Sequence, residues 1–178
     1  MNEEQMNEEQ LNELLKQSKT LNEKISFYLK HKTITKINPG EQEIKGHIEK
    51  AEHNLKYTKA VLDLKEFNDW GIVGCYYSIY HMALALILKK GYFSKNHDAT
   101  LCILIKEYYK KDLTEEDIRL LNEAYFDNED VLIYTQSKEE REKASYSTQI
   151  FFDENSVEDL RQRSISFTRK ANQILSKI

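Results

Sequence analysis

The chain has 178 residues, of which 31% are charged and 40% hydrophobic, and its formal net charge is −4. This length suits one domain with a buried core, and the slightly acidic balance excludes a global basic field that would attract nucleic acid or an anionic membrane. One proline and five glycines leave few helix breakers, so the composition favours an all-helical protein.

The N-terminal segment predicts a helical extension. Its first ten residues repeat Met-Asn-Glu-Glu-Gln, which is too acidic and polar for a secretion signal and favours a cytoplasmic protein. Apolar side chains then recur at helical spacing from Leu11 to Leu29 and predict one helix that ends near His31. The stretch "TITKINPGE" has the β-branched residues and the Pro-Gly pair of a linker. We therefore expect an extension at residues 1–31 and the main domain at residues 32–178.

The next two helices are predicted to form the centre of the domain. Apolar residues on one face predict a helix from Glu41 to Phe67, and Asn68 or Asp69 is the expected N-cap of the following helix. That helix contains no Asp, Glu, Lys or Arg from Trp70 to Leu88. It is long enough to span a membrane, but it holds three tyrosines and a histidine, and it is flanked by charged segments. We expect a bundle helix buried on nearly all faces.

The rest of the chain predicts further helices. They run from Ala99 to Lys110, from about Thr114 to Ser145 with an interruption at "FDNED", and from Val157 to Ile178. No segment shows the alternation of a strand, so the sequence predicts an all-α antiparallel bundle of five to six helices with an extra N-terminal helix. Cys75 and Cys102 lie in apolar helical contexts and are expected to be small buried side chains.

Several motifs together resemble the HEPN superfamily, particularly its small archaeal and bacterial members of the UPF0332 type. In chain order the motifs are "IEKAEHNLKYTKAVLDLKEFNDW", "GCYYSIYHMALALILKKG", "SKNHDA" and "EEREKASYS". The resemblance covers about residues 32–175 and implies a helical bundle that forms a homodimer, often encoded beside a minimal nucleotidyltransferase. Many members of the superfamily cleave RNA without a metal ion, through an arginine and a histidine separated by four to six residues at the dimer cleft.

The matching positions in this chain are Arg141 and Tyr146, so a tyrosine replaces the motif histidine. A tyrosine with an ordinary pKa near about 10 is a poor base at neutral pH, whereas an arginine can hold phosphate through two hydrogen bonds. Ser145 replaces the aspartate of the family. The resemblance gives Arg141 and Tyr146 as candidate catalytic residues and gives the candidate ligand-binding set Arg141, Glu142, Ser145, Tyr146 and Tyr77. The alternative is that Arg141 pairs with neighbouring glutamates on a solvated surface.

The histidines offer one further catalytic candidate. His81 lies four residues after Tyr77 on the same helical face, and it is either catalytic or a core histidine bonded to Tyr77 or to an adjacent helix. His97 is expected to cap the fourth helix or to close the turn before it. His31, His47 and His53 are expected on exposed faces without partners. Their spacing lacks a third zinc ligand, and no glycine-rich phosphate loop is present, so no metal or cofactor is expected.

Three functions follow from these observations. The first is a homodimeric module that binds nucleotide or RNA and pairs with a nucleotidyltransferase in a toxin–antitoxin or defence system. The second is an active metal-independent endoribonuclease with an altered Arg-x4-Tyr motif. The third is a non-catalytic adaptor whose N-terminal helix docks a partner. The acidic segment 112–130 and the basic segment 157–178 would orient a dimer or a partner, or would simply be solvated faces.

Overall fold

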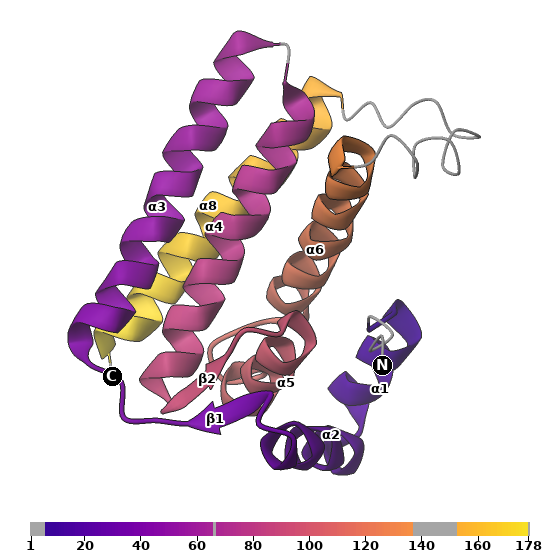
Figure 1. The fold of residues 1–178 in the computed structure, drawn as a ribbon, viewed down its shortest axis with the longest axis vertical. Helices are drawn as coiled ribbons and strands as arrows, with labels where there is room; N and C mark the ends of the chain where they lie inside the picture. Colours follow the sequence, from indigo (N-terminus) through magenta and orange to yellow (C-terminus); the bar gives the residue numbers. More distant parts are fainter. Residues whose placement is uncertain (1–5, 66, 137–152, 178) are drawn as a thin grey trace.

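The computed structural model describes residues 6–65, 67–136 and 153–177 and shows a helical bundle (Figure 1). The all-α class predicted from the sequence is confirmed. Within these residues, four long helices lie side by side, and three shorter helices and a small sheet lie across one end of the bundle. The long helices are α3 (Glu41–Leu64), α4 (Asn68–Lys89), α6 (Glu115–Gln136) and α8 (Glu154–Lys177). The shorter elements are α1 (Glu8–Lys16), α2 (Ser18–Lys30), α5 (His97–Tyr108), β1 (Ile34–Lys36) and β2 (Tyr92–Ser94).

Helix α4 is the central helix of the bundle and packs against α3, α5, α6 and α8. By length and hydropathy it could cross a membrane, but 83% of its most apolar window is buried inside the fold, as expected of a core helix. Its close packing depends on Gly74, because a Cβ there would collide with Thr58 Oγ1 on α3. The predicted side-chain cap is wrong: Phe67 occupies the N-cap position, and no side chain caps the helix.

The N-terminal segment differs from the predicted single helix. The chain breaks at Gln17, whose extended backbone (φ −118°, ψ 97°) separates α1 from α2. Both helices bury apolar side chains in the same core as α4 and α5. The backbone N–H of Met6 also donates to Asp98 Oδ2 of α5 at 3.0 Å, and Arg119 of α6 binds Glu8 of α1. From Met6 onwards, the segment before β1 is therefore packed into the fold.

The predicted absence of strands is also wrong. β1 and β2 form a two-stranded antiparallel sheet in which Thr35 lies opposite Phe93. Each strand has three residues, too few for a recognisable alternation, and the two partners are far apart in the chain. Gly91 enters β2 with a positive φ of 77°, which a glycine adopts without strain.

Two predictions about the later helices are corrected. Helix α6 passes through "FDNED" without interruption to Gln136, because its buried face continues from Leu121 through Ala124 and Asn128 to Val131. The remainder of the predicted helix, up to Ser145, lies outside the described residues. The N-cap of α5 is Asn96, whose Oδ1 accepts from the Ala99 N–H at 2.8 Å, and not His97.

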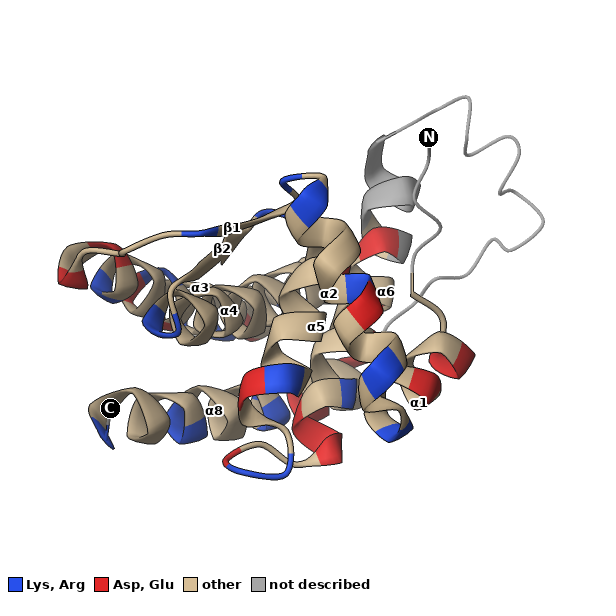
Figure 2. Cartoon of the chain, turned by 90° about the horizontal axis from the view of Figure 1, so that it is seen from below, with Lys and Arg blue, Asp and Glu red and all other residues tan. Residues whose placement is uncertain are grey.

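The charged residues of α6 and α8 are largely used within the fold. Asp117 accepts from the Thr114 N–H at 2.7 Å, as in a capping box, and also binds Lys170 of α8 at 2.6 Å. Arg163 of α8 binds Glu123 of α6 at 2.6 Å. Figure 2 shows basic residues recurring along α8. The contrast between the acidic segment 112–130 and the basic C-terminal helix therefore serves, at these contacts, to join two helices of one chain.

Candidate functional site

The predicted site residues divide into two groups. Arg141, Glu142, Ser145 and Tyr146 fall within residues 137–152, outside the described residues. Tyr77 and His81 lie on α4, one helical turn apart, with ring centroids 6.3 Å from each other. Among the described residues, the candidate site therefore centres on Tyr77 and His81.

His81 lies in direct contact with a second histidine on the neighbouring helix. Nδ1 of His81 is 2.9 Å from Nδ1 of His47 on α3. The ring centroids are 5.2 Å apart, which is about the nitrogen–nitrogen distance plus the distance from ring centre to nitrogen at each end. The two Nδ1 atoms therefore point at one another, as in an in-line N–H···N hydrogen bond and unlike two ligands that converge on a metal ion.

This contact corrects the expectation that His47 is exposed and without a partner. It also shows that the hydrogen bond of His81 reaches an adjacent helix, which was one of the two arrangements considered for a core histidine. The two histidines are equally far along the chain from Leu64, where α3 ends. In a hairpin of two antiparallel helices that turns near Leu64, residues at equal distances from the turn lie side by side. The equal spacing of His47 and His81 from Leu64 is the signal in the sequence that could have revealed the pair.

The local environment keeps both imidazoles of the pair neutral. Burial lowers the pKa of His81 to about 4, with further lowering by His47 and Lys50. Burial also lowers the pKa of His47, and the Lys50 ammonium adds to this effect whereas the Glu43 carboxylate opposes it. A neutral pair needs one histidine to donate from Nδ1 and the other to accept at Nδ1, so their Nε2 atoms are a base and a donor respectively.

The outer edges of the pair are open to solvent. Both histidines are only half-buried. Neither Nε2 atom makes a hydrogen bond with a described residue, and neither is a buried atom without a partner, so both are accessible to solvent. Beside His81, Tyr77 is 38% exposed, and Lys50 forms no ion pair with any described residue. Solvent therefore reaches the imidazoles of the pair, with the Tyr77 ring beside His81 and the Lys50 ammonium close enough to act on its pKa.

The other tyrosines of α4 have a different role. Tyr76 and Tyr80 turn towards α5 and α6, where they pack around His97 with ring centroids 6.1 Å from its imidazole. Tyr125 of α6 stacks on the same imidazole at 4.0 Å. His97 is 6% exposed, and burial lowers its pKa to about 3. This cluster is part of the core and is closed to a ligand.

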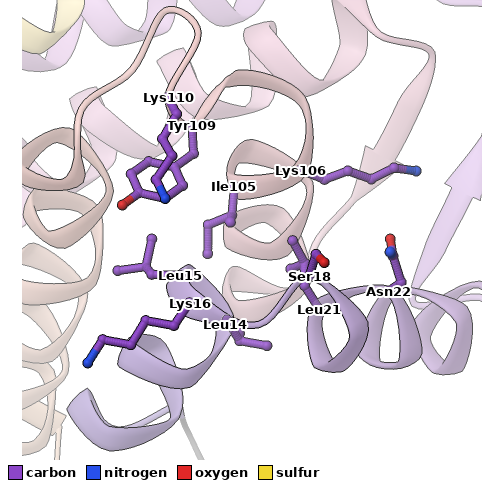
Figure 3. Close-up of a pocket in the computed structure, with 10 residues that line it drawn as sticks. All are labelled: Leu14, Leu15, Lys16, Ser18, Leu21, Asn22, Ile105, Lys106, Tyr109 and Lys110. Carbon is purple, nitrogen blue, oxygen red and sulfur yellow. The ribbon is translucent and has the colours of Figure 1, made fainter.

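A cavity of about 320 Å³ lies between the N-terminal helices and α5 (Figure 3). Its floor is formed by leucines of α1 and α2 and by Ile105, and three lysines lie at its edge. The ammonium groups do not converge: Lys106 extends away from the cavity and lies 3.3 Å from Tyr92 Oη. The cavity therefore lacks the convergent charge of an anion site.

Metal binding has no support within the described ranges, where no group of three or more His, Cys, Asp or Glu side chains could hold an ion. Cys75 and Cys102 are both free and buried. Burial raises the pKa of Cys75 to about 11 and that of Cys102 to about 12, so neither is a reactive thiolate at neutral pH.

Comparison with known proteins places this fold in a family. The profile of the HEPN domain matches residues 44–172, which cover α3 to α8, and the chain therefore belongs to the HEPN domain family. It is also similar to two proteins of Methanocaldococcus jannaschii. It is 34% identical to "Putative toxin MJ0142" over 85 residues, which are 47% of this chain and 57% of that protein. It is 33% identical to "Putative toxin MJ0605" over 107 residues, which are 60% of this chain and 70% of that protein.

Proposed function

We propose that this HEPN protein is a cytoplasmic, homodimeric module of a toxin–antitoxin or defence system that binds RNA or a nucleotide and works with a nucleotidyltransferase partner. The family match over residues 44–172 is the observation that carries the proposal. The names of the two relatives support the toxin role. Under this proposal residues 1–31 extend the domain at residues 32–178.

The proposed ligand site contains Arg141 and Tyr146 from each protomer. Arginine binds a phosphate through two hydrogen bonds in a fixed geometry, and a tyrosine ring can stack on a base. Glu142 and Ser145 lie between these two residues in the sequence and are the proposed neighbours of the ligand. A two-fold axis would bring two such sets into one cleft, which accounts for the requirement for a dimer.

Two measurements on the full-length protein test this function. Sedimentation velocity at micromolar concentrations should give a dimer, and a monomer at high micromolar concentration would contradict the shared cleft. Fluorescence anisotropy with a labelled single-stranded RNA should show weaker binding by Arg141→Ala, by about 1.5–3 kcal/mol for a lost charged hydrogen bond. Arg163→Ala is the matched control, because this exposed arginine is paired with Glu123 on the surface of the bundle. Equal RNA affinity in the two variants would rule out Arg141 as the phosphate ligand.

Cleavage of RNA is the second candidate function. The replacement of the motif histidine by Tyr146 weighs against it, but the solvent-accessible pair His47–His81 is a specific observation in its favour. Imidazoles transfer protons efficiently near neutral pH, whereas an ordinary tyrosine does not.

A further inference from the structure

The exposed apolar side chains of the protein gather on the hairpin formed by α3 and α4. Six large apolar side chains are exposed among the described residues, and only Phe27 of α2 lies elsewhere. The other five lie on α3, on α4 or in the turn between them, and we call them the hairpin face: Tyr57, Leu64, Phe67, Trp70 and Tyr77. Single exposed apolar residues are common on proteins, whereas a gathered group marks an interaction surface.

Three rings of the hairpin face form one continuous patch. Helical spacing places Trp70, Gly74 and Tyr77 on the same side of α4. Cδ1 of Tyr57 on α3 lies 3.0 Å from the position that a Cβ on Gly74 would occupy, so its ring lies between Trp70 and Tyr77. Helix α8 packs on the far side of α3 and α4 (Figure 2). The three rings are 38–39% exposed, so the described residues leave this patch open.

We propose that a second copy of this chain packs on the hairpin face, and that Tyr57, Trp70 and Tyr77 of both protomers form the apolar centre of the dimer interface around a two-fold axis. This inference rests on the proposed homodimer, because it assigns the surface through which that dimer forms.

The position of the face fits the shared cleft of the proposed function. Residues 137–152, which include the proposed ligand residues, connect α6 to α8. Nζ of Lys65, directly after α3, lies 3.9 Å from Oε1 of Glu154 at the start of α8. Helix α6 ends at this same end of the bundle (Figure 1). A two-fold axis through the face near Trp70, in the first turn of α4, therefore brings this end of both protomers together.

The absence of charge favours a second copy over a charged partner. Helix α4 has no Asp, Glu, Lys or Arg from Trp70 to Leu88, and the five side chains of the hairpin face are all uncharged. Two copies of such a face meet without opposing like charges and without burying an unpaired one. A strongly acidic or basic partner would gain no ion pair from these five side chains.

The size of the face suits the centre of a dimer interface. The five side chains together expose about 400–500 Å², given about 200 Å² for each fully exposed side chain of this size. A stable interface of ordinary size buries about 800 Å² on each partner, with an apolar centre and a polar rim. Tyrosine and tryptophan are also the residues that most often carry the binding energy of an interface.

Sedimentation velocity of the full-length protein over a dilution series tests the assignment through the dissociation constant of the dimer. Trp70→Lys and Tyr57→Lys each remove a ring and place like charges in both halves of the interface. We expect each to weaken the dimer by about 100-fold or more. Phe27→Lys is the matched control, because Phe27 is also an exposed aromatic residue but lies outside the hairpin face, and it should dimerise like the native protein. Circular dichroism should show a cooperative thermal transition in all three variants.

Trp70 allows a second test on the native protein, because it is the only tryptophan of the chain. Its side chain is partly exposed in the single protomer and becomes buried in the proposed interface. The native dimer should therefore emit at a shorter wavelength, and be quenched less by acrylamide, than the monomer obtained by dilution or by Tyr57→Lys. Equal emission and equal quenching in dimer and monomer would overturn the assignment.

The outcomes separate this inference from the proposed function. A native dimer that is equally stable in Trp70→Lys and Tyr57→Lys would overturn the hairpin face as the interface, and would leave the proposed dimer in place on another surface. A native protein that stays monomeric at high micromolar concentration would contradict the proposed dimer itself. Loss of the dimer in Phe27→Lys as well as in the two hairpin variants would also overturn the assignment, because the effect would not be specific to this face.

Discussion

At the scale of single residues, His97 shows how burial controls an ionisable side chain. Its folded-state pKa of about 3 lies below the ordinary value near 6.5, so the unfolded chain binds more protons between these two pH values. Stability is therefore full above about pH 6.5 and declines as the pH falls towards 3, by about 1.4 kcal/mol per pH unit from this one group. His97→Phe keeps the aromatic contact with Tyr125 and removes the titration. In urea unfolding between pH 7 and pH 4, we expect the unfolding free energy of the variant to fall less than that of the native protein. An equal fall in the two proteins would contradict the assignment of this pH dependence to His97.

Two glycines on adjacent helices give opposite expectations at the same scale. Gly74 on α4 faces Thr58 Oγ1 and the Tyr57 ring, so the methyl group of Gly74→Ala must push α3 and α4 apart. We expect a loss of about 1–3 kcal/mol of unfolding free energy, the usual cost of overpacking. Gly46 lies inside α3 with nothing within 4 Å of its missing Cβ. Gly46→Ala should therefore raise stability by about 1 kcal/mol, through helix propensity alone. Chemical denaturation of the two variants measures both unfolding free energies, which should be lower for Gly74→Ala and higher for Gly46→Ala than that of the native protein.

At the scale of elements, the sequence predicts the long helices well because their signals are local. The start of α3 at Glu41, the end of α4 at Lys89 and the capping box at Thr114 all follow from residues within a few positions of each boundary. The sheet and the His47–His81 contact could not be predicted in this way, because each joins segments that are distant in the chain. The break at Gln17 is likewise unmarked, since neither glycine nor proline occurs near it.

The attachment of α1 to α6 leads to a prediction at the element scale. Arg119 on α6 binds Glu115 within its own helix at 2.7 Å, and reaches across to Glu8 at 2.6 Å and to Asn12 on α1. Arg119→Gln removes these charged contacts, and we expect faster hydrogen exchange of the α1 amides and a loss of about 1 kcal/mol. Arg163→Gln removes one exposed pair with Glu123, so its effect should be smaller and should leave the exchange of α1 unchanged. Unchanged exchange in α1 after Arg119→Gln would mean that apolar packing alone holds this helix.

At the scale of the whole molecule, the structure bears on the hypothesis of an adaptor with a separable N-terminal helix. Such an adaptor should lose its partner when residues 1–31 are deleted and should otherwise stay folded. The structure gives the opposite expectation. Seven apolar side chains of this segment are buried in the common core: Met6, Leu11, Leu14, Leu15, Leu21, Ile25 and Tyr28.

The magnitude of this burial decides the expected result of the deletion. Each fully buried side chain of this size contributes about 1.5–3 kcal/mol, so the seven together are comparable with the total stability of about 5–15 kcal/mol that a domain has. Deletion of residues 1–31 should therefore abolish the cooperative thermal transition measured by circular dichroism. Within the full chain, Leu11→Ala should lower stability by about 2–5 kcal/mol, whereas Phe27→Ala, at a side chain that is 45% exposed, should have little effect. A truncated protein that melts like the full-length chain would show that residues 32–178 fold alone, and would restore the N-terminal helices as a docking arm.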